Sequence, residues 1–130
     1  MEIDIRYLMN ETIRKVVVSP EKDELALLTN AGVYIMYHRQ DCCENVLLED
    51  VVGDFADIIG SPVIRVSVDT NQGDIPHPGS DSWTWTFYTI HTAKGHVTLR
   101  WLGESNGYYG ESVDVRHERD MPAWAETKEE

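Results

Sequence analysis

Three aromatic side chains alternate along the chain shortly before an arginine. Trp83, Trp85 and Phe87 occupy every second position of one run, and Arg100 lies in the next alternating run. Alternation with a period of two places such side chains on one face of a β-strand. Bases stack on aromatic rings, and a guanidinium group binds phosphate through paired hydrogen bonds. The pattern therefore indicates a face that can bind a small, planar, phosphorylated ligand.

A hairpin is expected to bring these residues together. The segment 92–95 predicts a loop between the two alternating runs, since it contains Lys-Gly. The loop sets the cross-strand pairs His91–His96, Thr89–Thr98, Phe87–Arg100 and Trp85–Leu102. The other face of the ribbon is apolar and suits a core: Tyr88, Ile90, Val97, Leu99 and Trp101. The alternative to a ligand site is a second packing layer in which Arg100 lies flat over Phe87, and the pattern alone favours this ordinary arrangement.

The partner of Arg100 on its other side depends on the next turn. If Asn106-Gly107 forms a two-residue loop, a third strand places Val113 opposite Arg100. If Ser105-Asn106 forms the loop, Glu111 lies opposite Arg100 and neutralises it. Asn-Gly is the commoner hairpin turn, which favours the first register. Both registers remain open from the sequence.

A second group of polar residues lies between 38 and 44. His38, Asp41, Cys42 and Cys43 could hold a metal ion, but zinc sites normally use Cys-x-x-Cys spacing with a second ligand pair. Neighbouring cysteines rarely bond to each other, so a reduced pair is expected. The acidic side chains beside them, Glu44 included, are expected to cap backbone amides. No metal site is predicted here.

No motif in the chain demands catalysis. A nucleophile elbow, a Walker-type phosphate loop and a dinucleotide fingerprint are all missing from the sequence. His91 and His96 could bind a metal across the hairpin end, but exposed histidines beside a Lys-Gly turn more often face solvent. We therefore predict no catalytic residue and no cofactor.

Composition limits the class of partner. A chain of 130 residues has room for one domain and one core. The 23 acidic and 11 basic side chains give a net charge of −12, which repels nucleic-acid polymers but leaves a small nucleotide as a possible ligand. The longest apolar runs are far shorter than the roughly 20 residues of a membrane helix, and no secretory signal begins the sequence. A cytosolic protein without a membrane partner is expected.

The expected fold is α+β, mostly an antiparallel sheet built as a meander of about six to eight strands. Besides the two runs of the ribbon, strands are predicted at 12–19, 24–29, 33–38, 46–51 and 62–69. Short helices are predicted near 3–9 and over 54–59, the second with Asp54 as its N-cap. Residues 70–81 read as a loop. The domain is expected to span 1–115, followed by an acidic tail, 116–130, whose Trp124 docks on the body or on a neighbouring subunit.

Several blocks of sequence occur in a distinctive order. They are His38-x-Gln40-Asp41-Cys42-Cys43-Glu44, Glu49-Asp50 with Gly53, Ile58-Ile59-Gly60-Ser61-Pro62, Trp83-Thr84-Trp85-Thr86-Phe87-Tyr88, Arg100-Trp101, and Gly103-Glu104-Ser105-Asn106-Gly107-Tyr108-Tyr109. Together, over roughly 12–115, they resemble the first-described family of phage Thoeris anti-defence proteins, the small "sponge" proteins. The resemblance implies sequestration of glycocyclic ADP-ribose signals, made by bacterial TIR-domain enzymes, without their cleavage. It also implies homo-oligomers with nucleotide pockets at subunit interfaces, a second site for cyclic oligonucleotides in some members, and action in the host cytoplasm.

The chemistry of the side chains predicts six ligand contacts. They form three pairs: Trp85 and Phe87 for stacking, Arg100 and Arg65 for phosphate, Asn106 and Tyr108 for base or ribose. The last pair is equally compatible with a plain hairpin tip. Two other functions are open: an enzyme that hydrolyses such a signal, and a protein–protein inhibitor of a host defence enzyme that uses the tail and the tryptophan face.

Overall fold

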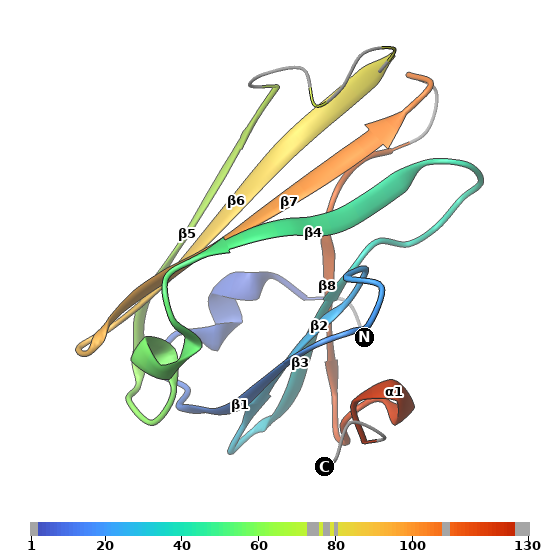
Figure 1. Cartoon of the computed structure of the whole chain (residues 1–130). Coiled ribbons are helices and arrows are strands. Elements are labelled where there is room, and N and C mark those ends of the chain that lie inside the picture. Colours follow the sequence, from blue (N-terminus) through green and yellow to red (C-terminus); the bar gives the residue numbers. More distant parts are fainter. Residues whose placement is uncertain (1–2, 73–75, 77–78, 80, 108–109, 127–130) are drawn as a thin grey trace.

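The computed structural model describes residues 3–72, 76, 79, 81–107 and 110–126 (Figure 1). The strands form two antiparallel sheets of four strands each. The first sheet has the order β1-β2-β3-β8 and contains β1 (Ile13–Val18), β2 (Leu25–Thr29), β3 (Gly32–Tyr37) and β8 (Asp114–Glu118). The second has the order β4-β7-β6-β5 and contains β4 (Asn45–Val52), β5 (Val63–Asn71), β6 (Ser82–Thr92) and β7 (Gly95–Ser105).

Helical structure in the described residues is limited to three short elements. These are the 3-10 helices η1 (Ile5–Leu8) and η2 (Phe55–Ile58) and the α-helix α1 (Ala123–Glu126). The predicted N-cap of the second helix is confirmed, because the Asp54 carboxylate accepts a hydrogen bond of 3.0 Å from the Ala56 amide. In the described part of the chain, no helix combines the length and the apolar character that crossing a membrane requires.

The two sheets face each other and share one core. Side chains alternate between this core and the outside along β6 and β7, as period-2 patterning requires. Trp101, Leu99 and Ile90 are fully buried on the inner face of the second sheet, against Leu27 and Met36 of the first. The prediction of a mostly antiparallel fold with six to eight strands is confirmed. The single meander is wrong, because one continuous sheet would leave its apolar face open to water.

The β6–β7 hairpin has the predicted register. His91 lies opposite His96, Thr89 opposite Thr98, and Phe87 opposite Arg100. The same register places Trp85 opposite Leu102. The short loop determines this pairing, because strand alternation leaves no freedom once the turn length is known.

The predicted third strand of the ribbon is wrong. The other neighbour of β7 is β4, so Asp50 lies opposite Arg100, and neither Val113 nor Glu111 does. The chain after β7 passes close over Gly103, where an added Cβ would overlap the Glu111 backbone. It then joins the other sheet as β8, which pairs with β3.

The C-terminal segment is part of the folded body. β8 continues to Glu118, so the first residues of the predicted tail form a strand. Trp124 docks on the body, as predicted: its Nε1 donates a hydrogen bond of 2.9 Å to Glu24 Oε1. Met121 and Trp124 pack on the outer face of the first sheet, against Ala26, Val33 and Ile35. This segment therefore covers apolar surface that the main core does not bury.

Candidate functional site

Two aromatic rings and a guanidinium group meet on the outer face of the second sheet. The Trp85 and Phe87 rings are nearly parallel, with 6° between their planes and 6.2 Å between their centroids. Arg100 Cζ lies 5.2 Å from the Trp85 ring centroid and 5.6 Å from that of Phe87. We call Trp85, Phe87 and Arg100 the aromatic–Arg100 cluster. Three of the six predicted contacts therefore come together, on positions that hairpin alternation fixes.

Arg100 already has an anionic neighbour. Its Nη1 lies 3.2 Å from Asp50 Oδ2, and the two side chains are 38% and 53% exposed. A register shift between Leu48 and Asp50 places Asp50 opposite Arg100 on the outer face of β4. An exposed ion pair of this kind contributes about 0–1 kcal/mol. A more highly charged anion can therefore replace Asp50 at little cost.

Two of the other predicted contacts, Arg65 and Asn106, lie on positions away from this cluster. Arg65 lies on β5 opposite His91, four positions along β6 from Phe87, which corresponds to roughly 13 Å. Asn106 follows the end of β7 and is exposed. Tyr108 lies outside the described residues. Within a single chain, strand geometry therefore places Arg65 and Arg100 too far apart to bind the same phosphate group.

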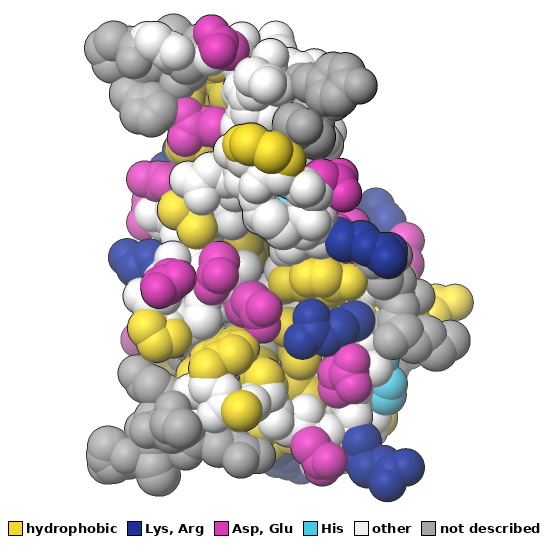
Figure 2. All heavy atoms as spheres, turned by 90° about the vertical axis from the view of Figure 1, so that its right-hand side faces the viewer, with side chains coloured by type: hydrophobic (Ala, Val, Ile, Leu, Met, Phe, Trp, Pro, Cys, Tyr) yellow, Lys and Arg dark blue, Asp and Glu magenta, His cyan; other side chains and the backbone are white. Residues whose placement is uncertain are grey.

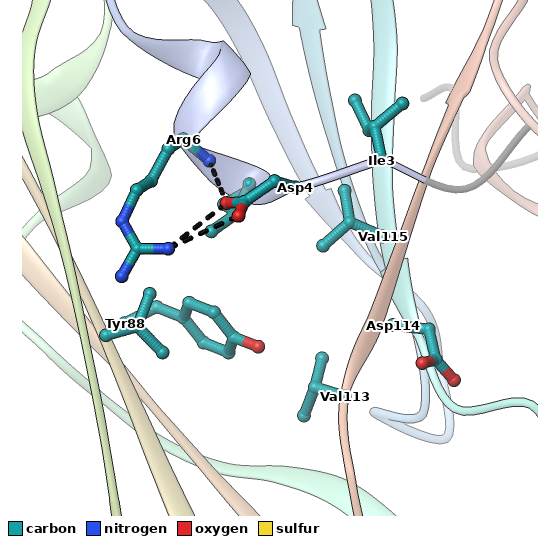
Figure 3. Close-up of a pocket in the computed structure, with 9 residues that line it drawn as sticks. Ile3, Asp4, Arg6, Tyr88, Val113, Asp114 and Val115 are labelled. Atoms are coloured by element: carbon teal, nitrogen blue, oxygen red, sulfur yellow. Dashed lines mark hydrogen bonds and ion pairs between the residues drawn. The ribbon is translucent and has the colours of Figure 1, made fainter.

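A groove between the two sheets was not foreseen. Two adjoining cavities of about 240 Å³ and about 480 Å³ share Val68, Tyr88 and Val113 in their walls. Figure 3 shows the Tyr88 ring projecting from β6 toward Val113, with Arg6 and Asp4 above it. The sequence assigned Tyr88 to the core face correctly, since it is 5% exposed. The groove arises where the inner face of β6 meets the segment before β8, a contact that local patterns do not predict.

Titratable groups along this groove have shifted pKa values. Burial, together with the carboxylates of Asp114 and Asp4, raises the pKa of Tyr88 to about 12, against a smaller opposite effect of Arg6. The phenol therefore stays neutral at physiological pH. Burial alone would raise the pKa of Glu111, but hydroxyl donors outweigh it and lower that pKa. The donors are Ser105 at 2.6 Å, Thr84 at 2.7 Å, and Ser82.

The turn at 38–44 is organised by a buried carboxylate. Glu44 Oε2 accepts a hydrogen bond of 2.7 Å from the Asp41 amide, and Oε1 accepts one of 2.9 Å from the Cys42 amide. The predicted capping of backbone amides is thus confirmed for Glu44. His38 Nε2 lies 2.7 Å from Glu44 Oε2, and its Nδ1 donates to the Ser112 carbonyl at 2.6 Å. The turn is thereby tied to the segment that precedes β8.

The adjacent cysteines are bonded to each other. A disulfide joins Cys42 and Cys43, so the expectation of a reduced pair is wrong. The expectation rested on the general rarity of disulfides between adjacent cysteines. It did not take into account the local turn, in which Glu44 accepts a hydrogen bond from the Cys42 amide. Among the described residues, no group of three or more histidine, cysteine or acidic side chains has a metal-binding arrangement.

Comparison with known families covers most of the chain. Residues 6–115 match the family model described as a domain of unknown function, DUF7448. The chain belongs to the DUF7448 family. No curated protein and no solved structure matches it significantly. The aromatic–Arg100 cluster and the 38–44 turn lie inside the DUF7448 range, whereas the segment that contains Met121 and Trp124 lies beyond it.

The Glu44 cap predicts a specific response to acid. Burial alone would raise the pKa of Glu44, but the Asp41 amide, the His38 ring and the Cys42 amide lower it from 4.5 to about 2. A depressed pKa in the folded state gives stability that is present above about pH 4.5 and is lost as the pH falls toward 2. Glu44→Gln is expected to lower the urea midpoint at pH 7 and to flatten its change between pH 4.5 and pH 2.

The measurement is urea unfolding, followed by circular dichroism, at several pH values. Glu49→Gln is the matched control, because Glu49 is an exposed carboxylate on the neighbouring strand β4. Parallel stability curves for wild type and Glu44→Gln would show that the cap does not cause the acid response.

Proposed function

We propose that this protein binds and sequesters a small cyclic nucleotide-type immune signal, of the glycocyclic ADP-ribose class, without cleaving it. Cyclic oligonucleotides are a second ligand class within this proposal. Sequestration would suppress Thoeris-type immunity in the host cytoplasm. The observation that carries the proposal is the aromatic–Arg100 cluster, in which one guanidinium group lies close to two nearly parallel rings. The resemblance of the ordered sequence blocks to the anti-defence sponges supports it.

The cluster supplies both interactions that a nucleotide requires. A base stacks on the half-buried Trp85 or Phe87 ring, and such stacking contributes about 1–3 kcal/mol per base. Arg100 exchanges the carboxylate of Asp50 for a phosphate oxygen pair, which matches the guanidinium fork. One arginine in a rigid position is sufficient for a small ligand.

The surface charge discriminates against polymers. Figure 2 shows acidic side chains scattered over a whole face of the molecule, with basic side chains between them. Binding to duplex DNA or RNA draws its energy from counterion release along a continuous basic stripe, and a net charge of −12 opposes it. A small nucleotide needs only the local field around Arg100.

In this proposal a second copy of the chain completes the pocket. Trp85 and Phe87 are half-buried in one chain, and Val52 of β4, which lies opposite Thr98, is 52% exposed. A homo-oligomer that covers this face would remove apolar surface from water and enclose the ligand, which strengthens the electrostatic contact with Arg100.

The test separates sequestration from hydrolysis. Excess protein is incubated with glycocyclic ADP-ribose, passed through a desalting column, and heat-denatured, and the released small molecules are identified by mass spectrometry. We expect nearly all of the added ligand to be retained and then released intact, since the protein is in excess and a sponge acts by affinity and abundance alone. Cleaved products would favour a hydrolase instead, and the absence of retained ligand would overturn the proposal.

Direct inhibition of a host protein is a distinct outcome of a parallel experiment. Pull-down of a host defence enzyme in the absence of nucleotide would favour a protein–protein inhibitor. Trp124 is half-buried and hydrogen-bonded to Glu24, so it is an unsuitable anchor for such a partner while it stays docked.

A further inference from the structure

Three nitrogen-bearing side chains lie in a row across the second sheet, at the end beside η2. Strand register places Arg65 of β5 opposite His91 of β6, and His91 opposite His96 of β7. Arg65 Nη2 lies 3.4 Å from His91 Nε2, and the two histidine ring centroids are 5.4 Å apart. All three lie on the outer face, and Arg65 and His96 are exposed. We call them the Arg65–histidine row.

Arg65 differs in its partner from three other arginines of the chain, and Arg14 donates to an amide oxygen, Asn30 Oδ1, at 3.2 Å. Arg6, Arg100 and Arg116 each lie within 3.3 Å of a carboxylate oxygen. Arg65 contacts an imidazole instead, and no carboxylate among the described residues lies within ion-pair distance of it. The chain has 23 acidic side chains, and a guanidinium group that pairs with none of them has N–H donors available for an external anion.

The row is better suited to an anion than to a metal ion. Burial, followed by the charges of Arg65 and His96, lowers the pKa of His91, so this ring is neutral at pH 7. Its Nε2 then accepts from Arg65 and cannot also bind a metal ion. A bound oxyanion has the opposite effect, because it favours the protonated, donating form of His91.

The neighbouring groups fit this interpretation. The hydroxyl groups of Thr89 and Thr98, two positions along the same face, share a hydrogen bond of 3.0 Å, which leaves one O–H as a further donor. Lys94 in the loop is engaged, since its Nζ donates to the Ile59 carbonyl at 2.8 Å. The Asp57 carboxylate of η2 packs against Gly95.

We propose that Arg65, His91 and His96 form a binding site for a phosphate-type oxyanion, and that the site takes up a proton as the anion binds. The ligand class is inorganic phosphate, or the terminal phosphate of a small metabolite. The site lies roughly 13 Å from the aromatic–Arg100 cluster along the strands. It stands independently of the proposed function, since neither its residues nor its probe involve nucleotide stacking.

The probe is sulfate, whose charge is constant between pH 6 and 8, added at constant ionic strength. Binding is followed by NMR of the histidine ring nitrogens. We expect the His91 and His96 signals to shift saturably at pH 6, with affinity at least about tenfold weaker at pH 8, because one proton enters with the anion. Inorganic phosphate then tests whether the same signals respond to the proposed ligand.

Variants and controls decide between specific binding and general screening. Arg65→Gln and His91→Gln are expected to abolish the saturable shifts, whereas Arg14→Ala, which removes an exposed arginine on β1, leaves them unchanged. Equal, non-saturating shifts in wild type and Arg65→Gln would overturn the proposal. Saturable binding with the same affinity at both pH values would also overturn it, as would tight binding of Zn²⁺ alone to the two histidines.

Discussion

Replacement of Arg100 by alanine is expected to weaken nucleotide binding by about thirtyfold or more. The guanidinium group is the cation that contacts both rings of the cluster, and truncating one partner of a charge-assisted pair costs about 2–5 kcal/mol. Isothermal titration calorimetry with glycocyclic ADP-ribose gives the dissociation constant directly. Arg14→Ala is the control, because it removes the same charge on the other sheet.

Asp50 should have the opposite effect. It is the carboxylate that the phosphate must displace from Arg100, so Asp50→Asn is expected to increase affinity by up to about fivefold, the equivalent of an exposed ion pair. Unchanged binding in Arg100→Ala would identify the cluster as a packing layer, the ordinary arrangement that the alternating pattern also allows. Weaker binding in Asp50→Asn would mean that Asp50 holds Arg100 in its binding position.

The second large effect concerns the core beneath this face. Trp101 is fully buried between the sheets, and Trp101→Ala is expected to lower the free energy of unfolding by about 3–5 kcal/mol because it leaves a cavity. Urea unfolding monitored by far-ultraviolet circular dichroism measures the loss without relying on tryptophan fluorescence.

Trp101→Phe tests how much of this loss comes from the cavity. The indole Nε1 of Trp101 is buried without a hydrogen-bond partner among the described residues, and an unpaired buried donor costs about 1–3 kcal/mol. Phenylalanine removes that donor and keeps most of the apolar volume, so its cost should be clearly smaller than that of alanine. Because both variants remove this N–H, equal costs would show that the size of the cavity does not determine the loss of stability.

Local sequence patterns were sufficient to predict the β6–β7 hairpin, which carries the candidate site. The turn length and period-2 alternation predicted the His91–His96 and Phe87–Arg100 pairs, because a hairpin is a short-range structure. They also predicted which face of β6 is buried. The same physics placed Asp54 as an N-cap, since a cap depends only on residues a few positions away.

Local sequence patterns could not predict the contacts between segments that are far apart in the chain. The pairing of Arg100 with Asp50 joins residues that are 50 positions apart and depends on a register shift in β4. The pairing of β8 with β3 also joins segments that are far apart in the sequence. The same holds for the segments that line the groove beside Tyr88. Arg65 was grouped with Arg100 by its chemistry alone, and only the strand positions show that the two lie apart.

The docked C-terminal segment bears on how this protein can be shortened. Cutting the chain at Val115, where the family match ends, would remove most of β8 and turn β3 into the rim of its sheet. Unpaired amides and carbonyls on β3 would then lie next to the uncovered Ala26, Val33 and Ile35. Such a rim is a template for self-association. A trimmed version intended for ligand studies should therefore keep the chain through residue 126.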